Sequence, residues 1–160
     1  MKRSIILLLV LGACVAPPTP PAVVPAPQTQ VVPVSPAPPP PVAWEDRART
    51  AGNWIYRVGA EGSVATFVGS AATLTMGCAN AREILVSHSG APSGALSIRT
   101  TTLARTLPVT AGQARLAAGD VLLDAIIYSR GKFMVSATGV SDLILPPWPE
   151  IARVVEDCRR

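Results

Sequence analysis

The chain has 160 residues, of which 49% are hydrophobic and 15% are charged, with 14 basic and 10 acidic side chains. Lys2 and Arg3 stand apart at the N-terminus, and without them the formal net charge falls from +4 to +2. So small an excess, with no basic stripe that is interleaved with aromatic residues, excludes a nucleic-acid-binding footprint.

The first thirteen residues have the pattern of an export signal. Two basic residues precede an unbroken apolar run over residues 5–11, and small residues follow. About 20 apolar residues are needed to cross the ~30 Å hydrocarbon core, so this run is too short for a permanent membrane helix. Residues 1–13 are therefore interpreted as a signal peptide that is removed.

The end of this signal resembles the bacterial lipobox, in which an aliphatic residue and two small residues precede a cysteine. The matching residues are Leu11, Gly12, Ala13 and Cys14. The resemblance implies cleavage before Cys14, diacylglycerol on its sulfur and usually a further acyl group on the new amine, so that membrane lipid is the first partner. Each buried CH₂ contributes about 0.8 kcal/mol, and two or three chains make a firm anchor where one is marginal.

The lipobox resemblance also implies a location. Val15 stands where an inner-membrane retention signal of lipoproteins often has aspartate, which favours a lipid anchor in the outer membrane, facing the periplasm. The alternative is an ordinary secretory signal cut near Ala13 or Ala16, which would leave a soluble periplasmic protein.

A second compositional zone covers residues 15–43, with twelve of the seventeen prolines and no charged side chain. Proline fixes φ and lacks an N–H, so the stretch can build neither a helix nor a sheet interior. Together with Cys14 it is predicted to be a disordered tether, residues 14–43. Polyproline II advances ~3.1 Å per residue, which gives a maximum reach of about 80–90 Å. A docking strip for a proline-recognising partner is the alternative.

Residues 44–160 have the size of one domain, and turn residues divide them into short runs typical of strands. Alternating or β-branched runs predict strands at residues 53–58, 63–68, 72–78, 83–87, 95–101, 103–109, 132–137 and 141–145. Glycines between the first three runs suit hairpin turns, which predicts an antiparallel meander. The expected class is mainly β (α+β), a single antiparallel β-sandwich or barrel-like domain.

Two further segments have helical spacing. Gly119 or Asp120 can cap a short helix over residues 120–128, which has an apolar side. A second helix begins at Pro149, which suits a first turn, and runs to the end of the chain. Its predicted apolar face consists of Ile151, Val154, Val155 and Cys158.

Assigning Cys14 to lipid leaves Cys78 and Cys158 in an oxidising compartment, where a disulfide between them is predicted. The bond would clamp the last helix against the sheet. The alternatives are a free thiol or a metal pair. Two sulfurs and the single histidine, His88, fall short of a zinc site, so neither metal nor cofactor is predicted.

His88 lies between Ser87 and Ser89, which invites comparison with a nucleophilic site. Adjacent residues on a strand point to opposite faces, so neither hydroxyl is aimed at the imidazole. We therefore expect a solvated loop histidine, and no catalytic residue is predicted. An enzyme centred on His88 stays as an alternative.

The aromatic residues are assigned by position. Trp54 and Tyr56, at strand spacing, are expected in the core. Trp44 is expected to be exposed, because it sits where the tether meets the domain, and Trp148 is either a hydrophobic staple for the last helix or a surface anchor. Trp44, Trp148 and His88 are thus the residues considered for contact with a partner.

Two stretches of the domain resemble small uncharacterised envelope proteins of alphaproteobacteria. They are Leu123 to Ala125 with Ser129 to Lys132, and Trp148 to Arg153 through Asp157 and Cys158. The order of helix, two strands and closing helix is also similar to the invasion-associated locus B family of periplasmic β-sandwich proteins, although the cysteine pattern of that family is not reproduced. Neither resemblance implies a known activity.

The predicted function is a non-catalytic binding or accessory module that holds an envelope protein or a cell-wall partner. One alternative is an inhibitor of a hydrolase, such as lysozyme or a protease, that inserts a loop such as residues 87–94 into the active site. The other is the enzyme centred on His88.

The lipobox resemblance predicts that Cys14 carries the lipid. Cells that express the chain and grow with a radioactive fatty acid should yield labelled protein, and Cys14→Ser should abolish the label because no other residue is expected to carry it. An unlabelled wild type, or equal labelling of both forms, would contradict lipidation.

Overall fold

The computed structural model describes residues 18, 42–70, 72–80 and 82–160. The predicted signal peptide, Cys14 and nearly all of the predicted tether lie outside the described residues. No helix within the described residues is both long enough and apolar enough to span a membrane.

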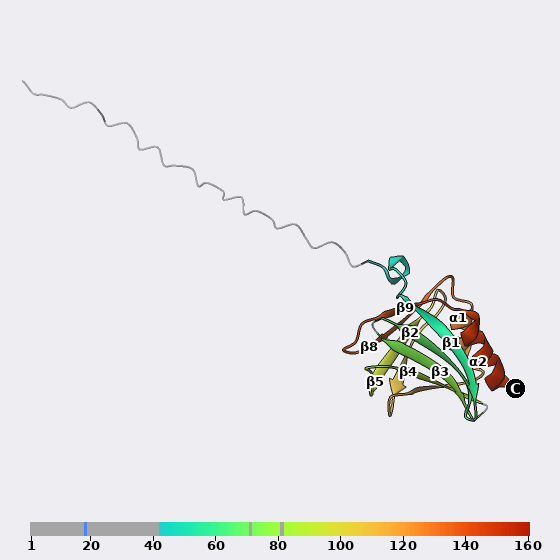
Figure 1. The fold of residues 1–160 in the computed structure, drawn as a ribbon. Helices are drawn as coiled ribbons and strands as arrows, with labels where there is room; N and C mark the ends of the chain where they lie inside the picture. Colours follow the sequence, from blue (N-terminus) through green and yellow to red (C-terminus); the bar gives the residue numbers. More distant parts are fainter. Residues whose placement is uncertain (1–17, 19–41, 71, 81) are drawn as a thin grey trace, which may run out of the picture. The chain divides into compact units, whose positions relative to one another are not determined.

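The described part of the domain consists mainly of strands, with two helices and one turn of 3₁₀ helix (Figure 1). The strands are β1 (Gly52–Gly59), β2 (Gly62–Gly69), β3 (Thr73–Ala79), β4 (Glu83–His88), β5 (Gly94–Arg99), β6 (Ala104–Val109), β7 (Ala114–Ala117), β8 (Phe133–Ala137) and β9 (Leu143–Leu145). The helical segments are η1 (Trp44–Asp46), α1 (Val121–Ile127) and α2 (Pro149–Arg159). Both α-helices lie together on one side of the strands in Figure 1. The predicted mainly β class, with a short internal helix and a C-terminal helix, is confirmed.

The strands form two antiparallel sheets. The first sheet has the order β1-β2-β3-β4-β7, and its first four strands make the predicted meander. The second sheet has the order β6-β5-β8-β9.

Hydrogen bonds also join the edges of the two sheets. Between β6 and β7, Thr110 and Gln113 exchange backbone bonds of 2.9 and 3.1 Å. At the other edges, the Thr50 N–H donates to the Ile144 carbonyl (2.8 Å), and the Ile144 N–H donates to the Thr50 hydroxyl (2.9 Å). The two sheets therefore approach a barrel, because neither pair of edges is left separate.

One core fills the space between the sheets and receives the buried sides of both helices. Its fully buried large side chains include Phe67, Leu74, Met76, Ile84, Leu96, Ile98, Leu122, Leu123, Ile126, Phe133, Leu143 and Leu145. Burying each such side chain contributes about 1.5–3 kcal/mol. Trp54 packs edge-on to Phe67 with ring centres 5.5 Å apart, and its indole N–H donates to the Pro146 carbonyl (2.9 Å). Its predicted place in the core is confirmed, whereas Tyr56 is only half-buried.

The helix ends follow the sequence signals. The Asp120 carboxylate accepts a 2.8 Å hydrogen bond from the Leu122 N–H and so caps α1, since the first N–H groups of a helix have no partner within it. Pro149 occupies the first turn of α2, where its missing N–H costs nothing. The predicted apolar face of α2 is fully buried.

Cys78 and Cys158 form the predicted disulfide across 80 residues of sequence. The bond joins the last turn of α2 to the end of β3, so it holds the C-terminal helix against the first sheet.

Strand β7 was not predicted from the sequence. Its four residues, Ala114 to Ala117, include two alanines and an arginine and no β-branched or aromatic side chain, so they carry little strand signal. The strand forms because it pairs with β4 and buries Ala114 and Leu116 in the core.

Removing the disulfide should destabilise the domain without changing its fold. For an 80-residue separation the chain-entropy model gives about 4.5 kcal/mol, within the ~2–5 kcal/mol seen when native disulfides are removed. We expect the double change Cys78→Ala and Cys158→Ala to lower the free energy of unfolding in urea by about 2–5 kcal/mol. Wild type treated with a thiol reductant is the control and should lose a similar amount. An unchanged urea midpoint would contradict the clamping role.

Candidate functional site

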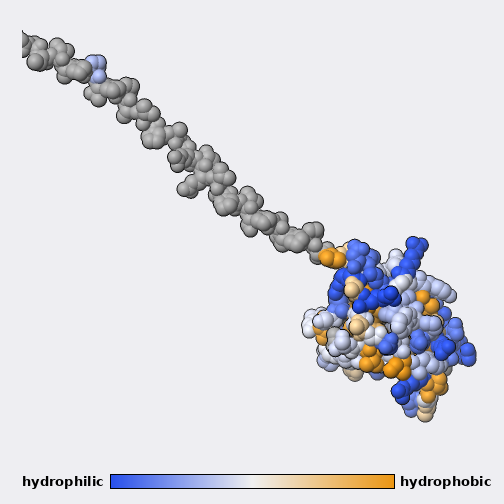
Figure 2. Space-filling view, turned by 45° about the horizontal axis from the view of Figure 1, so that its top comes forward, coloured by the Kyte–Doolittle hydropathy of each residue, from blue (hydrophilic) through white to orange (hydrophobic). Residues whose placement is uncertain are grey.

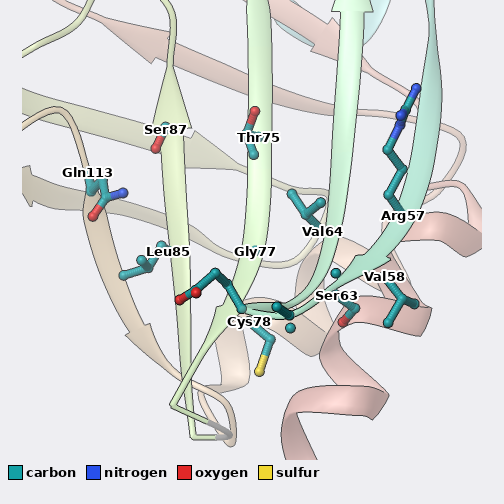
Figure 3. Close-up of a pocket in the computed structure, with 14 residues that line it drawn as sticks. Arg57, Val58, Ser63, Val64, Thr75, Gly77, Cys78, Leu85, Ser87 and Gln113 are labelled. Carbon is teal, nitrogen blue, oxygen red and sulfur yellow. The ribbon is translucent and has the colours of Figure 1, made fainter.

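A shallow hollow of about 460 Å³ lies on the outer face of the first sheet, opposite the core (Figure 3). We call it the sheet hollow. Its lining residues are Arg57, Val58, Gly59, Ala60, Glu61, Gly62, Ser63, Val64, Thr75, Gly77, Cys78, Leu85, Ser87 and Gln113. The sequence did not predict this site, because its members are small and uncharged for the most part and come from four separate segments.

The strand register creates the depression. Gly77 on β3 is paired with Val64 on β2 and with Leu85 on β4, so a residue without a side chain lies between two branched ones. Figure 3 shows Val64 and Leu85 on the two sides of Gly77. A Cβ placed on Gly77 would meet nothing closer than the Val64 Cγ2, at 3.6 Å. A methyl group could therefore be added at Gly77 without strain.

The β1–β2 hairpin forms one end of the sheet hollow. Gly62 has a φ of +118°, and a Cβ there would lie 2.8 Å from the Cys78 carbonyl oxygen. Only glycine allows so close an approach in this conformation. The hairpin thus lies tightly over the end of β3, which places Ala60 and Glu61 at the rim.

Polar groups without internal partners surround the uncharged floor. Within the described residues, the side chains of Thr75, Ser87 and Gln113 make no hydrogen bond. Nor do Arg57 and Glu61 form an ion pair with any described residue. The sheet hollow therefore offers hydroxyl and amide groups, one positive charge and one negative charge to a ligand.

Large apolar side chains are also exposed on this sheet. Ile55, Val58 and Val68 are 41%, 70% and 49% exposed, respectively. Figure 2 shows hydrophobic patches interspersed with hydrophilic ones on one face of the domain. These side chains are exposed singly among hydrophilic ones, so they add apolar area beside the sheet hollow without forming a continuous patch.

The expectation of a solvated His88 was wrong. Strand β4 runs one residue further than predicted, and its alternation turns His88 into the domain, where it is only 5% exposed. Its Nδ1–H donates to the Ser89 carbonyl (2.7 Å), and its buried Nε2 has no partner among the described residues. Ser87 lies on the opposite face of β4, and the Ser89 hydroxyl accepts from the Thr73 N–H (2.8 Å). The structure therefore does not bring either serine to the imidazole.

The expectation of an exposed Trp44 was also wrong, since it is only 6% exposed. The segment after it folds back onto β8 and β9: Arg47 pairs with Asp142 (2.6 Å), and Lys132 donates to the Arg47 carbonyl (2.8 Å). Trp148 is 36% exposed at the cap of α2, which leaves part of its ring available for contact.

A second polar cluster holds α2 to β1. The Tyr56 hydroxyl donates to the Asp157 carboxylate (2.6 Å), and the Arg153 guanidinium lies 5.8 Å from the centre of the Tyr56 ring. The hydrogen bond from Tyr56 is the main cause that lowers the pKa of Asp157. The same bond raises the pKa of Tyr56, because it favours the protonated hydroxyl. We assign this cluster to stability.

Another hollow, of about 570 Å³, is bordered by Arg82, Arg159 and Arg160. The Arg159 guanidinium pairs with the Asp124 carboxylate (2.9 Å), and the Arg160 guanidinium lies 3.8 Å from the Asp157 carboxylate. These pairs offset much of the local positive charge. Across residues 42–70, 72–80 and 82–160, no group of three His, Cys, Asp or Glu side chains is placed to hold a metal ion.

Comparison of the chain with protein-family models, with curated proteins and with solved structures finds no match. The resemblances drawn from the sequence stay predictions.

The contact between Tyr56 and Asp157 predicts a pH-dependent stability. The pKa of Asp157 is lower in the folded state than its ordinary value of about 4, so the carboxylate stabilises the fold above that pH, and this contribution disappears as the pH falls through the lowered pKa. We expect Asp157→Asn to lose stability near neutral pH and to show a weaker decline than wild type on acidification, measured by urea unfolding. Tyr56→Phe removes the hydrogen bond that is the main cause of the lowered pKa of Asp157. This variant should also lose stability near neutral pH and decline less on acidification. An Asp157→Asn protein with the wild-type pH profile would contradict this assignment.

Proposed function

We propose that the chain is a lipid-anchored lipoprotein of the bacterial envelope whose globular domain holds a partner without catalysing a reaction. Cys14 would join it to membrane lipid, in the outer membrane facing the periplasm. The proline-rich stretch, residues 14–43, would let the domain reach its partner at a distance from the membrane. The partner would be another envelope protein or a component of the cell wall.

The observation that carries the binding role is the sheet hollow. Ligand sites are concave and largely apolar, with a few polar groups that fix the orientation of the ligand. The floor at Gly77 and its neighbours Val64 and Leu85 supplies the apolar part, and Thr75 and Ser87 supply polar groups that no described residue satisfies.

The placement of the serines supports binding rather than catalysis. Ser87 faces the sheet hollow, whereas the adjacent His88 points into the core. A serine hydroxyl is a weak nucleophile unless a base activates it. An enzyme centred on His88 is thus the less supported alternative.

The inhibitor alternative depends on the segment 87–94. Two of its residues, Ser87 and His88, belong to β4, Ala91 is buried, and the Pro92 carbonyl accepts a hydrogen bond from the Gly112 N–H (2.8 Å). Residues 89, 90 and 92–94 are exposed, but the buried Ala91 and the bond to Pro92 hold this loop against the domain. The outer face of the first sheet is therefore the better-supported contact surface.

The test is a photo-crosslinking amino acid in place of Thr75, introduced into the full lipoprotein in living cells. Thr106, on the outer face of β6 in the second sheet, is the matched control position. We expect one discrete crosslinked product from position 75 and none from position 106. The product should disappear when Gly77→Leu fills the sheet hollow, because a partner that binds specifically requires the space above Gly77. Crosslinks from random collisions would survive this substitution. Equal products from both positions, or none from position 75, would contradict the proposed binding face.

A further inference from the structure

We infer that the sheet hollow binds the zwitterionic backbone of a short peptide made of small residues. This rests on the proposed function, because it names the class of ligand for the same site. Three features carry it: the width of the floor, the polar groups along it and the two opposite charges at its rim.

The width of the floor selects small side chains. Neighbouring strands lie about 4.8 Å apart, so Val64 and Leu85, one strand to either side of Gly77, are separated by two such spacings. The Val64 Cγ2 lies 3.6 Å from the position of a Cβ on Gly77, so the Val64 side chain narrows the slot above Gly77. The slot admits an extended chain with side chains the size of a methyl group, and large side chains would collide with Val64 or Leu85.

The polar groups fit a peptide better than a hydrocarbon. Thr75 and Ser87 are direct cross-strand partners, which places their Cβ atoms about 4.5–5.5 Å apart. Figure 3 shows both beside the floor, with Gln113 at its far side. Each hydroxyl both donates and accepts, and the amide does the same, so together they match the alternating N–H and C=O groups of a backbone. An acyl chain would cover these groups without giving them partners, which is unfavourable.

The two rim charges fit a ligand that has both an amine and a carboxylate. Arg57 can donate two hydrogen bonds to a carboxylate, and Glu61 can accept from an ammonium group. In Figure 3 the Arg57 side chain runs along β1, beyond Val64, so the ligand must extend past Val64 to meet it. Arg57 is paired with Val64 and so lies two strand spacings, or about 10 Å, from Gly77, which three extended residues can span. A purely anionic ligand would be repelled by Glu61, and a purely cationic one by Arg57.

The experiment uses the full chain with Cys14→Ser, labelled with ¹⁵N, and trialanine as the probe. We expect saturable shifts of the backbone amide signals of Val64, Thr75, Gly77 and Leu85. Trialanine amide, which lacks the carboxylate, and N-acetyl-trialanine, which lacks the amine, should each bind about 3- to 5-fold more weakly, as expected for the loss of one exposed ion pair.

Variants assign each charge and separate binding from folding. Arg57→Gln should remove the difference between trialanine and its amide, and Glu61→Gln should remove the difference between trialanine and its acetylated form. Gly77→Leu should abolish the shifts while the remaining amide signals keep their folded-state positions, because a Cβ on Gly77 meets only ordinary contacts and the hollow beyond it is open. Thr106→Leu places the same side chain on the second sheet, and this variant should bind trialanine as wild type does.

The outcomes distinguish the ligand class from the binding role. Absent shifts, shifts that survive Gly77→Leu, or equal binding of the blocked peptides would overturn the peptide assignment. If trialanine does not bind while position 75 still crosslinks to a partner in cells, the ligand class is wrong and the binding face stands. If trialanine does not bind and position 75 gives no crosslinked product, both the ligand class and the binding face are wrong.

Discussion

The pairing of β3 with its two neighbours is the constraint on which the rest of the structure depends. Its register places Gly77 outward, between Val64 and Leu85, and the next residue, Cys78, inward towards Cys158. A slip of one residue would exchange these two faces, since side chains alternate along a strand. The same hydrogen bonds therefore set both the hollow on the outer face and the covalent clamp on the inner one.

The inner face of the first sheet stabilises the domain, and its outer face carries the proposed binding site. Its inner face packs on the core, and α2 is held there by its apolar side, by the disulfide and by the contact of Tyr56 with Asp157. Because the helices gather on one side of the strands (Figure 1), the outer face around Gly77 stays open. Rigid strands then position the polar groups of the site, which reduces the ordering that a ligand would have to induce.

Much of the fold was predictable from local patterns, and the failures have particular causes. The Asp120 cap and the apolar face of α2 follow from spacing within single segments, the meander from glycines between neighbouring runs, and the disulfide from the cysteine count. Strand β7 was missed because its alanines carry little strand preference and only β4 gives it a partner. Trp44 and His88 were wrongly expected to be exposed, because the burial of a residue at the end of a segment depends on what packs over it. For Trp44 this is the following chain, which Arg47 joins to β8 and to the residue before β9.

The sequence by itself determined the mainly β class, the helix limits and the pairing of Cys78 with Cys158, because each follows from periodicity, capping residues or cysteine count. It also supplied the hypothesis of a lipidated Cys14. Only the tertiary structure decided that His88 is sealed in the core and that Arg57, Glu61, Thr75 and Ser87 surround one hollow. These side chains are brought together by strand register, and register arises from cross-strand pairing and shared burial, which no single segment encodes.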